Sequence, residues 1–139
     1  MRTGYKVCDA MTQRPIAVSP YTSIASCASL MARHHVGSLV VKRGDHLVGL
    51  LTEKDIVRKV VAKKLSPKKT RAADIMQTNF PTIAPEKDIY SALTLMRDRN
   101  VRQLPVMAGS RMVGFLTTKD ILKIQPQLFE ILSEKIELR

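Results

Sequence analysis

In the first half of the chain, a segment whose apolar residues have helical spacing is followed by segments whose apolar residues are typical of β-strands. Four apolar residues follow the i, i+3, i+4, i+7 spacing that forms one face of an amphipathic α-helix. They are Ile24, Cys27, Ala28 and Met31. The run 39–41 is short, continuous and apolar, and a turn separates it from a second apolar run at 46–51. The pattern predicts a helix followed by two strands, with a brief earlier strand at 16–18 that ends before Pro20.

The same pattern returns 65 residues later, so that Asp74 aligns with Asp9. Identical pairs at this offset include Met11/Met76, Pro20/Pro85, Ile24/Ile89, Leu30/Leu95, Met31/Met96, Val36/Val101, Leu39/Leu104, Val41/Val106 and Gly44/Gly109. A fixed period of this length indicates a structural repeat, and two copies are too few for an open solenoid. We therefore expect the copies to pack on each other as a pseudo-two-fold pair, with a ligand site in the groove between them.

Each copy predicts a β-α-β-β-α unit of the α+β class, preceded by a short helical turn. The first repeat extends over 7–64 and the second over 72–125, with a basic linker at 65–71. The tail 126–139 has apolar residues at helical spacing and predicts a C-terminal amphipathic helix. These residues are Leu128, Ile131, Leu132 and Ile136. A domain of about 60 residues buries only about 60% of its unfolded surface and is marginally stable alone, so packing of the two repeats would supply the missing burial.

Turn and capping residues mark the ends of these elements. Gly44 and Gly109 lie between paired strands, where a tight hairpin favours a glycine with positive φ. Thr22 or Ser23 can cap the first long helix, and Asp88 can cap its counterpart.

Composition places the chain among ordinary globular proteins. The hydrophobic fraction is 45%, and no apolar run approaches the roughly 18 residues of a membrane helix. The N-terminus leads into no apolar segment like that of a signal peptide, so we expect a cytoplasmic protein without a membrane anchor. Cys8 and Cys27 belong to no metal-binding spacing, which favours buried free thiols and no metal.

The formal net charge of +11 favours anionic partners such as nucleotides, nucleic acids or acidic proteins. Between Arg58 and Arg71 the chain carries basic residues and no acidic one. The basic residues are Arg58, Lys59, Lys63, Lys64, Lys68, Lys69 and Arg71. This basic strip is either a solvated surface or a docking site for nucleic acid or an acidic partner. Stacking aromatics, which single-strand binders usually add to basic grooves, do not interleave with these charges.

A Gly-x-x-Thr-x-x-Asp motif occurs intact in both copies, as 49–55 and 114–120. The glycine would let the backbone approach a ligand closely. The threonine stands where a helix begins and can offer a hydroxyl and an N–H to a phosphate. The aspartate, three residues later, can accept both hydrogen bonds from a ribose 2′,3′-diol. The same Thr-x-x-Asp spacing is also an ordinary helix-capping arrangement, so both interpretations remain open at this stage.

In this combination of motifs, the chain resembles the CBS-domain (cystathionine β-synthase domain) family in two tandem copies over about 7–125. The matching signature comprises Asp-x-Met-Thr at 9–12, Val-x-Pro at 18–20, Leu-Pro-Val at 104–106 and the doubled Gly-x-x-Thr-x-x-Asp. Tandem pairs of this family, called Bateman modules, bind adenosine-containing ligands in two clefts between the repeats, and many pair into disc-shaped homodimers. They usually sense a metabolite and regulate an attached or partner protein.

The resemblance implies two nucleotide-binding sets, each drawn from both repeats. One comprises Met11, Arg14, Ile16, Val36 and Gly37 with Thr117 and Asp120. The other comprises Met76, Asn79, Pro81, Val101 and Arg102 with Thr52 and Asp55. Arg102 could neutralise a phosphate, whereas Gly37 at the equivalent position brings no charge. The two clefts are therefore expected to differ in affinity.

The resulting expectation is a stand-alone regulatory module that binds AMP, ADP or ATP, forms a homodimer and acts on a protein partner. The alternatives are an S-adenosylmethionine-type ligand or nucleic acid on the basic surface. No positioned nucleophile, base or metal set is evident, so no catalysis is expected.

Overall fold

The computed structural model describes residues 1–130, which divide into two compact units. One unit is Pro15–Phe80, and the other joins Met1–Arg14 to the chain from Pro81 on. The α+β class and the two repeats predicted from the sequence are confirmed, whereas the predicted repeat limits stay predictions.

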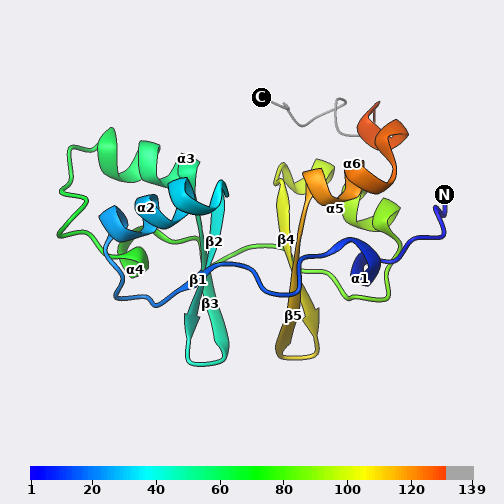
Figure 1. Ribbon diagram of the computed structural model, residues 1–139, viewed down its shortest axis with the longest axis horizontal. Coiled ribbons are helices and arrows are strands. Elements are labelled where there is room, and N and C mark those ends of the chain that lie inside the picture. Colours follow the sequence, from blue (N-terminus) through cyan, green and yellow to red (C-terminus); the bar gives the residue numbers. More distant parts are fainter. Residues whose placement is uncertain (131–139) are drawn as a thin grey trace. The chain divides into compact units, whose positions relative to one another are not determined.

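The unit Pro15–Phe80 contains a three-stranded sheet and its covering helices (Figure 1). Its elements are β1 (Ala17–Val18), α2 (Ile24–His34), β2 (Ser38–Arg43), β3 (His46–Thr52), α3 (Glu53–Ile56) and α4 (Ala72–Ile75). Strand β1 pairs parallel with β2, and β2 pairs antiparallel with β3. The helix that begins with α3 continues as a π-helical segment, Val57–Val61, which the sequence pattern did not predict.

The other unit repeats the main features of this plan. Its elements are α1 (Val7–Ala10), α5 (Ile89–Arg99), β4 (Gln103–Ala108), β5 (Arg111–Thr117), α6 (Thr118–Ile124) and a 3₁₀ turn (Pro126–Leu128). Strands β4 and β5 form an antiparallel pair. The segment equivalent to β1 makes only a single parallel bridge, from Ile83 to Val106.

The turns and caps explain where these elements begin and end. Gly44 and Gly109 have φ of 62° and 63°, as a tight hairpin requires. The side chain of Ser23 accepts the hydrogen bond from Ser26 N, so Ser23 is the cap of α2. Asp88 caps α5 by accepting from Tyr90 N at 2.8 Å, as predicted. His35 and Asn100 end α2 and α5 in the left-handed conformation that commonly terminates helices.

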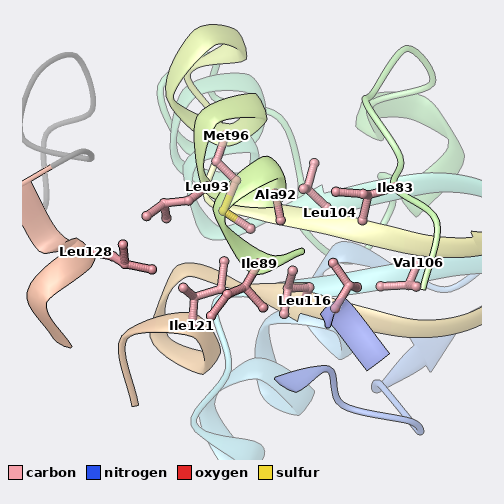
Figure 2. Packing of buried hydrophobic residues seen from close by; sticks show 11 residues of the cluster. Ile83, Ile89, Ala92, Leu93, Met96, Leu104, Val106, Leu116, Ile121 and Leu128 are labelled. Carbon is pink, nitrogen blue, oxygen red and sulfur yellow. The ribbon is translucent and has the colours of Figure 1, made fainter. Parts of the chain in front are cut away.

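Each unit has its own buried core. Figure 2 shows the core of the second unit, where side chains of α5 meet those of β4, β5 and α6. Leu128 of the tail is 2% exposed and belongs to this core, whereas Phe129 remains 49% exposed. The predicted helix 126–139 is therefore a 3₁₀ turn at its start, and its remainder, 131–139, lies outside the described residues.

The N-terminal segment of each repeat packs with the strands of the other repeat. Helix α1 contacts β5, α5 and α6, and Thr12 pairs with Phe115 (Figure 1). In the same way, Gln77 pairs with Leu50 of β3. The compact units therefore do not coincide with the two sequence repeats.

Candidate functional site

Both copies of the Gly-x-x-Thr-x-x-Asp motif join the end of a strand to the start of a helix. Thr52 Oγ1 accepts from Asp55 N at 3.2 Å, and Asp55 Oδ2 accepts from Thr52 N at 3.0 Å. Thr117 and Asp120 form the same reciprocal pair, at 3.3 Å and 2.9 Å. These are capping boxes with aspartate as the returning acceptor, so the capping interpretation of the motif is confirmed in both copies.

The two motif glycines make room for methionines. A Cβ built on Gly49 would lie 2.8 Å from Met76 Cγ, and one on Gly114 would lie 2.9 Å from Met11 Cγ. Real Cβ atoms essentially never approach other atoms so closely. The Met of each Asp-x-Met segment fills the space beside the glycine, which explains why a side chain is absent there. The expectation that these glycines admit a ligand to the backbone stays a prediction.

Asp55 is enclosed by partners from its own unit. Its side chain is 7% exposed, and Oδ2 also accepts from Thr52 Oγ1 at 3.0 Å and Gln77 Nε2 at 3.1 Å. Lys59 Nζ lies 3.1 Å from Oδ1 and also donates to the Ile75 carbonyl at 3.0 Å. Sequence reasoning missed both Lys59 and Gln77. The i, i+4 spacing of Asp55 and Lys59 on a helix was the signal that could have identified Lys59 as a partner of Asp55.

Asp120 has a more open environment. Its side chain is partly exposed, and among residues 1–130 its only hydrogen bond through the carboxylate is the one from Thr117 N. The positions that correspond to Lys59 and Gln77 are Ile124 and Thr12, neither of which carries a cation. The two motifs thus share a backbone geometry but differ in how much of the carboxylate is free.

Each of the two predicted nucleotide-binding sets is divided between the compact units. From the first set, Met11, Arg14, Thr117 and Asp120 lie in one unit and Ile16, Val36 and Gly37 in the other. From the second set, Met76, Asn79, Thr52 and Asp55 lie in one unit and Pro81, Val101 and Arg102 in the other. Within its unit, Met11 is brought to the motif that contains Thr117, and Met76 to the motif that contains Thr52. The assignment of these residues to ligand sites stays a prediction.

Several of the predicted residues are fixed through their backbones. The Ile16 carbonyl accepts from Val40 N at 3.1 Å, and the Gly37 carbonyl accepts from Glu53 N at 3.0 Å. The Arg102 carbonyl likewise accepts from Thr118 N at 3.0 Å, while its side chain is half-buried. Arg14 and Asn79 are exposed, and Pro81 is buried.

The basic strip is exposed, but part of it is already engaged. Lys59 pairs with Asp55, and Arg71 Nη1 donates to the Tyr21 carbonyl at 2.6 Å. The other basic residues of the strip are exposed. A role in binding nucleic acid stays a prediction.

The two cysteines differ in environment. Cys27 is buried in the core, and this burial raises the pKa of its thiol to about 11. Cys8 is exposed, which contradicts the expectation that both thiols are buried. Its position in the short helix α1 leaves its side chain outside the core, because Val7 is the buried residue of that turn.

Within residues 1–130, no three His, Cys, Asp or Glu side chains are grouped so that they could hold a metal ion. No described helix has both the length and the apolar character needed to cross a membrane. The cytoplasmic location expected from the sequence stays a prediction.

The family model described as CBS domain matches residues 7–62 and 72–126. An uncharacterized protein of Methanopyrus kandleri is 32% identical over 88% of this chain, which spans 63% of that relative's length. Hypoxic response protein 1 of Mycobacterium tuberculosis is 29% identical over 86% of this chain and 84% of its own.

Solved structures agree with this match. An uncharacterized conserved protein from Pyrococcus horikoshii superposes with a TM-score of 0.81 and 26% identity, over 100% of this chain and 98% of its own. A CBS domain pair in complex with 5′-methylthioadenosine and S-adenosyl-L-methionine superposes with a TM-score of 0.77 and 26% identity, over 86% and 98%. With two matched copies that together cover most of its length, the chain belongs to the CBS-domain family as a tandem pair.

Proposed function

We propose that this protein is a regulatory module that binds an adenosine-containing ligand, with AMP, ADP or ATP as the first candidates, and that it catalyses no reaction. CBS domain pairs generally bind regulatory ligands, and one structural neighbour holds two adenosine derivatives. The observation that carries the proposal is the Asp120 carboxylate, which is partly exposed, adjoins Thr117 and, as far as residues 1–130 are concerned, keeps acceptor positions free. A ribose diol needs such a carboxylate, because it donates two hydrogen bonds.

The positive charge of the chain supports a phosphate-bearing ligand. At +11, the chain attracts anions and raises their local concentration near its surface. S-adenosylmethionine carries the same adenosine without a phosphate and is therefore the informative competitor.

Isothermal titration calorimetry of the full chain with AMP, ATP and S-adenosylmethionine tests this function. We expect saturable binding of at least one of the three. The absence of heat from all three, in protein shown to be folded by circular dichroism, would refute the proposal. The nucleotide recovered after long incubation should be chemically unchanged, and turnover would contradict the non-catalytic assignment.

We further propose that two copies of this chain pair through the helices of the Pro15–Phe80 unit. An open apolar groove of about 330 Å³ lies on this unit. It is lined by Ala28, Met31, Ala32, Glu53, Ile56 and Val57. Val57 and Val61 are 58% and 61% exposed, which is unusual for two valines on one helical segment. A second copy would cover this surface with an equivalent one, as two-fold symmetric dimers do.

A further inference from the structure

The two copies of the Gly-x-x-Thr-x-x-Asp motif have unequal carboxylates, and this difference is encoded in the sequence. Lys59 and Gln77 surround Asp55, whereas Ile124 and Thr12 occupy the corresponding positions for Asp120. An isoleucine at position 124 cannot donate a hydrogen bond or supply a charge. The lack of a cation at position 124 therefore does not depend on a particular side-chain rotamer.

Asp55 has little capacity left for a ligand. An ionised carboxylate has about four lone-pair sites. Its Oδ2 accepts from Thr52 N, Thr52 Oγ1 and Gln77 Nε2, and its Oδ1 lies 3.1 Å from Lys59 Nζ and 3.4 Å from Gln77 Nε2. A ribose diol at Asp55 would have to displace Lys59, which is also held by the Ile75 carbonyl.

Asp120 has the capacity that Asp55 lacks. Its Oδ2 accepts from Thr117 N at 2.9 Å, and in the part of the chain that the structure describes its Oδ1 accepts no hydrogen bond. The side chain is partly exposed and can be reached from solvent. A diol can therefore bind without breaking any bond that stabilises the helix.

We propose that Asp120 is the carboxylate that holds the ribose of the ligand, and that Lys59 closes the equivalent position at Asp55. One adenosine-containing ligand then binds per chain, and Asp55 is a structural residue. This assignment rests on the proposed function and goes beyond it, because it states which of two like motifs binds the sugar and which side chain disables the other.

Three substitutions test whether Asp120 binds the ligand and Asp55 does not. Asp120→Asn keeps an oxygen that can accept from Thr117 N but removes the charge, so we expect AMP affinity to fall about 10- to 150-fold with little change in melting temperature. Asp55→Asn should lower the melting temperature, because a neutral amide would then face the Lys59 ammonium. It should leave the AMP affinity within about twofold of wild type, because Asp55 holds no ligand in this assignment. Lys59→Met should free Asp55 and raise the stoichiometry from one AMP per chain toward two.

The matched control is Lys63→Met, which removes an exposed lysine four residues beyond Lys59. It should alter neither stoichiometry nor melting temperature. The readouts are calorimetric titration with AMP and thermal unfolding followed by circular dichroism, both on the full chain. S-adenosylmethionine replaces AMP as the probe if only it binds the wild type.

The outcomes distinguish this assignment from the proposed function. If the wild type binds neither probe nor ATP, the proposed function fails and the assignment fails with it. If the wild type binds and Asp55→Asn weakens binding as much as Asp120→Asn does, the function stands and the assignment is overturned. Two equal sites in the wild type would also overturn it.

Discussion

Met11 and Met76, which the family resemblance implicates in ligand binding, each fill the space beside a motif glycine. Each lies against the motif glycine of the other repeat, at a separation that leaves no room for a Cβ atom. The repeated Asp-x-Met and Gly-x-x-Thr-x-x-Asp segments were visible in the sequence as separate signals. Their contact was not, because it depends on long-range pairing such as that of Leu50 with Gln77.

We expect Gly49→Ala to destabilise the protein by about 1–3 kcal/mol, as overpacking in a filled site commonly does. The new Cβ would meet Met76 Cγ and come within 3.1 Å of the Gln77 carbonyl oxygen. In urea unfolding, Gly49→Ala combined with Met76→Ala should cost less than the sum of the two single changes. Additive costs would show that Met76 is not the group that requires the glycine.

The two thiols should react at very different rates. In native protein at pH 8 we expect a disulfide reagent such as 5,5′-dithiobis(2-nitrobenzoate) to modify Cys8 promptly and Cys27 only after unfolding. Cys8 is exposed, whereas Cys27 is buried and burial raises its pKa to about 11, so little thiolate forms. The Cys8→Ser variant serves as the control. Fast modification of that variant in its native state would contradict the buried placement of Cys27.

Most helices and strands could be predicted from the sequence. The places where the structure differs from the prediction have physical causes. The spacing of Ile24 and Met31 located α2, and the glycines at 44 and 109 located both hairpins. The π-helical segment Val57–Val61 has no marker of its own in the sequence. The strand at 16–18 formed, but its counterpart near Ile83 is reduced to one bridge. Single bridges and unusual turns depend on contacts that local residue patterns do not encode.

The residues that precede α1 are attached to the start of α5 through the side chain of Asp88. This carboxylate accepts from Tyr90 N and also from Thr3 N, Thr3 Oγ1 and Gly4 N. Burial alone would raise the pKa of Asp88, but the hydrogen bonds from Tyr90, Thr3 and Gly4 outweigh it and hold the pKa below its ordinary value. A lowered pKa in the folded state means that the ionised form stabilises the fold.

The attachment of residues 1–10 should therefore weaken in acid. The stabilisation is complete above the ordinary aspartate pKa of about 3.9 and is lost as the pH falls through the lower folded value. Protection of the Thr3 and Gly4 amides against hydrogen exchange, relative to the intrinsic rate at each pH, should fall over this range, and Asp88→Ala should give the same loss of protection at pH 7. Asp45→Ala, in an exposed turn, is the control. An unchanged exchange rate in Asp88→Ala would contradict the role of Asp88.

For the chain as a whole, the sequence indicated the family and predicted two unequal clefts, but it did not show which side chains surround each motif carboxylate. The doubled signature gave the repeat and the α+β class, and the family match agrees. The different surroundings of Asp55 and Asp120 could not be predicted, because Gln77 reaches Asp55 from 22 positions away in the sequence. In the basic strip, Lys59 pairs with Asp55 and Arg71 donates to the Tyr21 carbonyl. The contact between Arg71 and Tyr21 also joins residues that are far apart in the sequence, so the sequence did not predict it.

Pairing of two copies should depend on the exposed valines. Light scattering coupled to size-exclusion chromatography should show a dimer for wild type, and Val57→Lys with Val61→Lys should shift the population toward monomer. A buried unpaired charge in an apolar interface is strongly unfavourable. Tyr21→Lys is the control, since Tyr21 is 64% exposed but lies outside both the groove and the helical segment that carries Val57 and Val61. A wild-type monomer at micromolar concentration, or a dimer indifferent to the two lysines, would contradict this pairing.

Binding to nucleic acid is the alternative that the charge of the chain keeps open. If the basic strip serves this purpose, retention on immobilised DNA or RNA should fall steeply as salt rises. Replacement of Lys63, Lys64, Lys68 and Lys69 by glutamine should then abolish it. Retention seen only at very low salt, and unaffected by these changes, would show general attraction between a basic protein and a polyanion.

The most direct test of the central claim compares AMP with 2′,3′-dideoxyadenosine monophosphate in calorimetric titrations of the wild-type chain. The two ligands share the base and the phosphate and differ only in the sugar hydroxyls. If a carboxylate of this chain accepts the diol, the dideoxy compound should bind about tenfold or more weakly, because each lost charge-assisted hydrogen bond costs about 1.5–3 kcal/mol. Equal affinity for the two compounds would contradict the account.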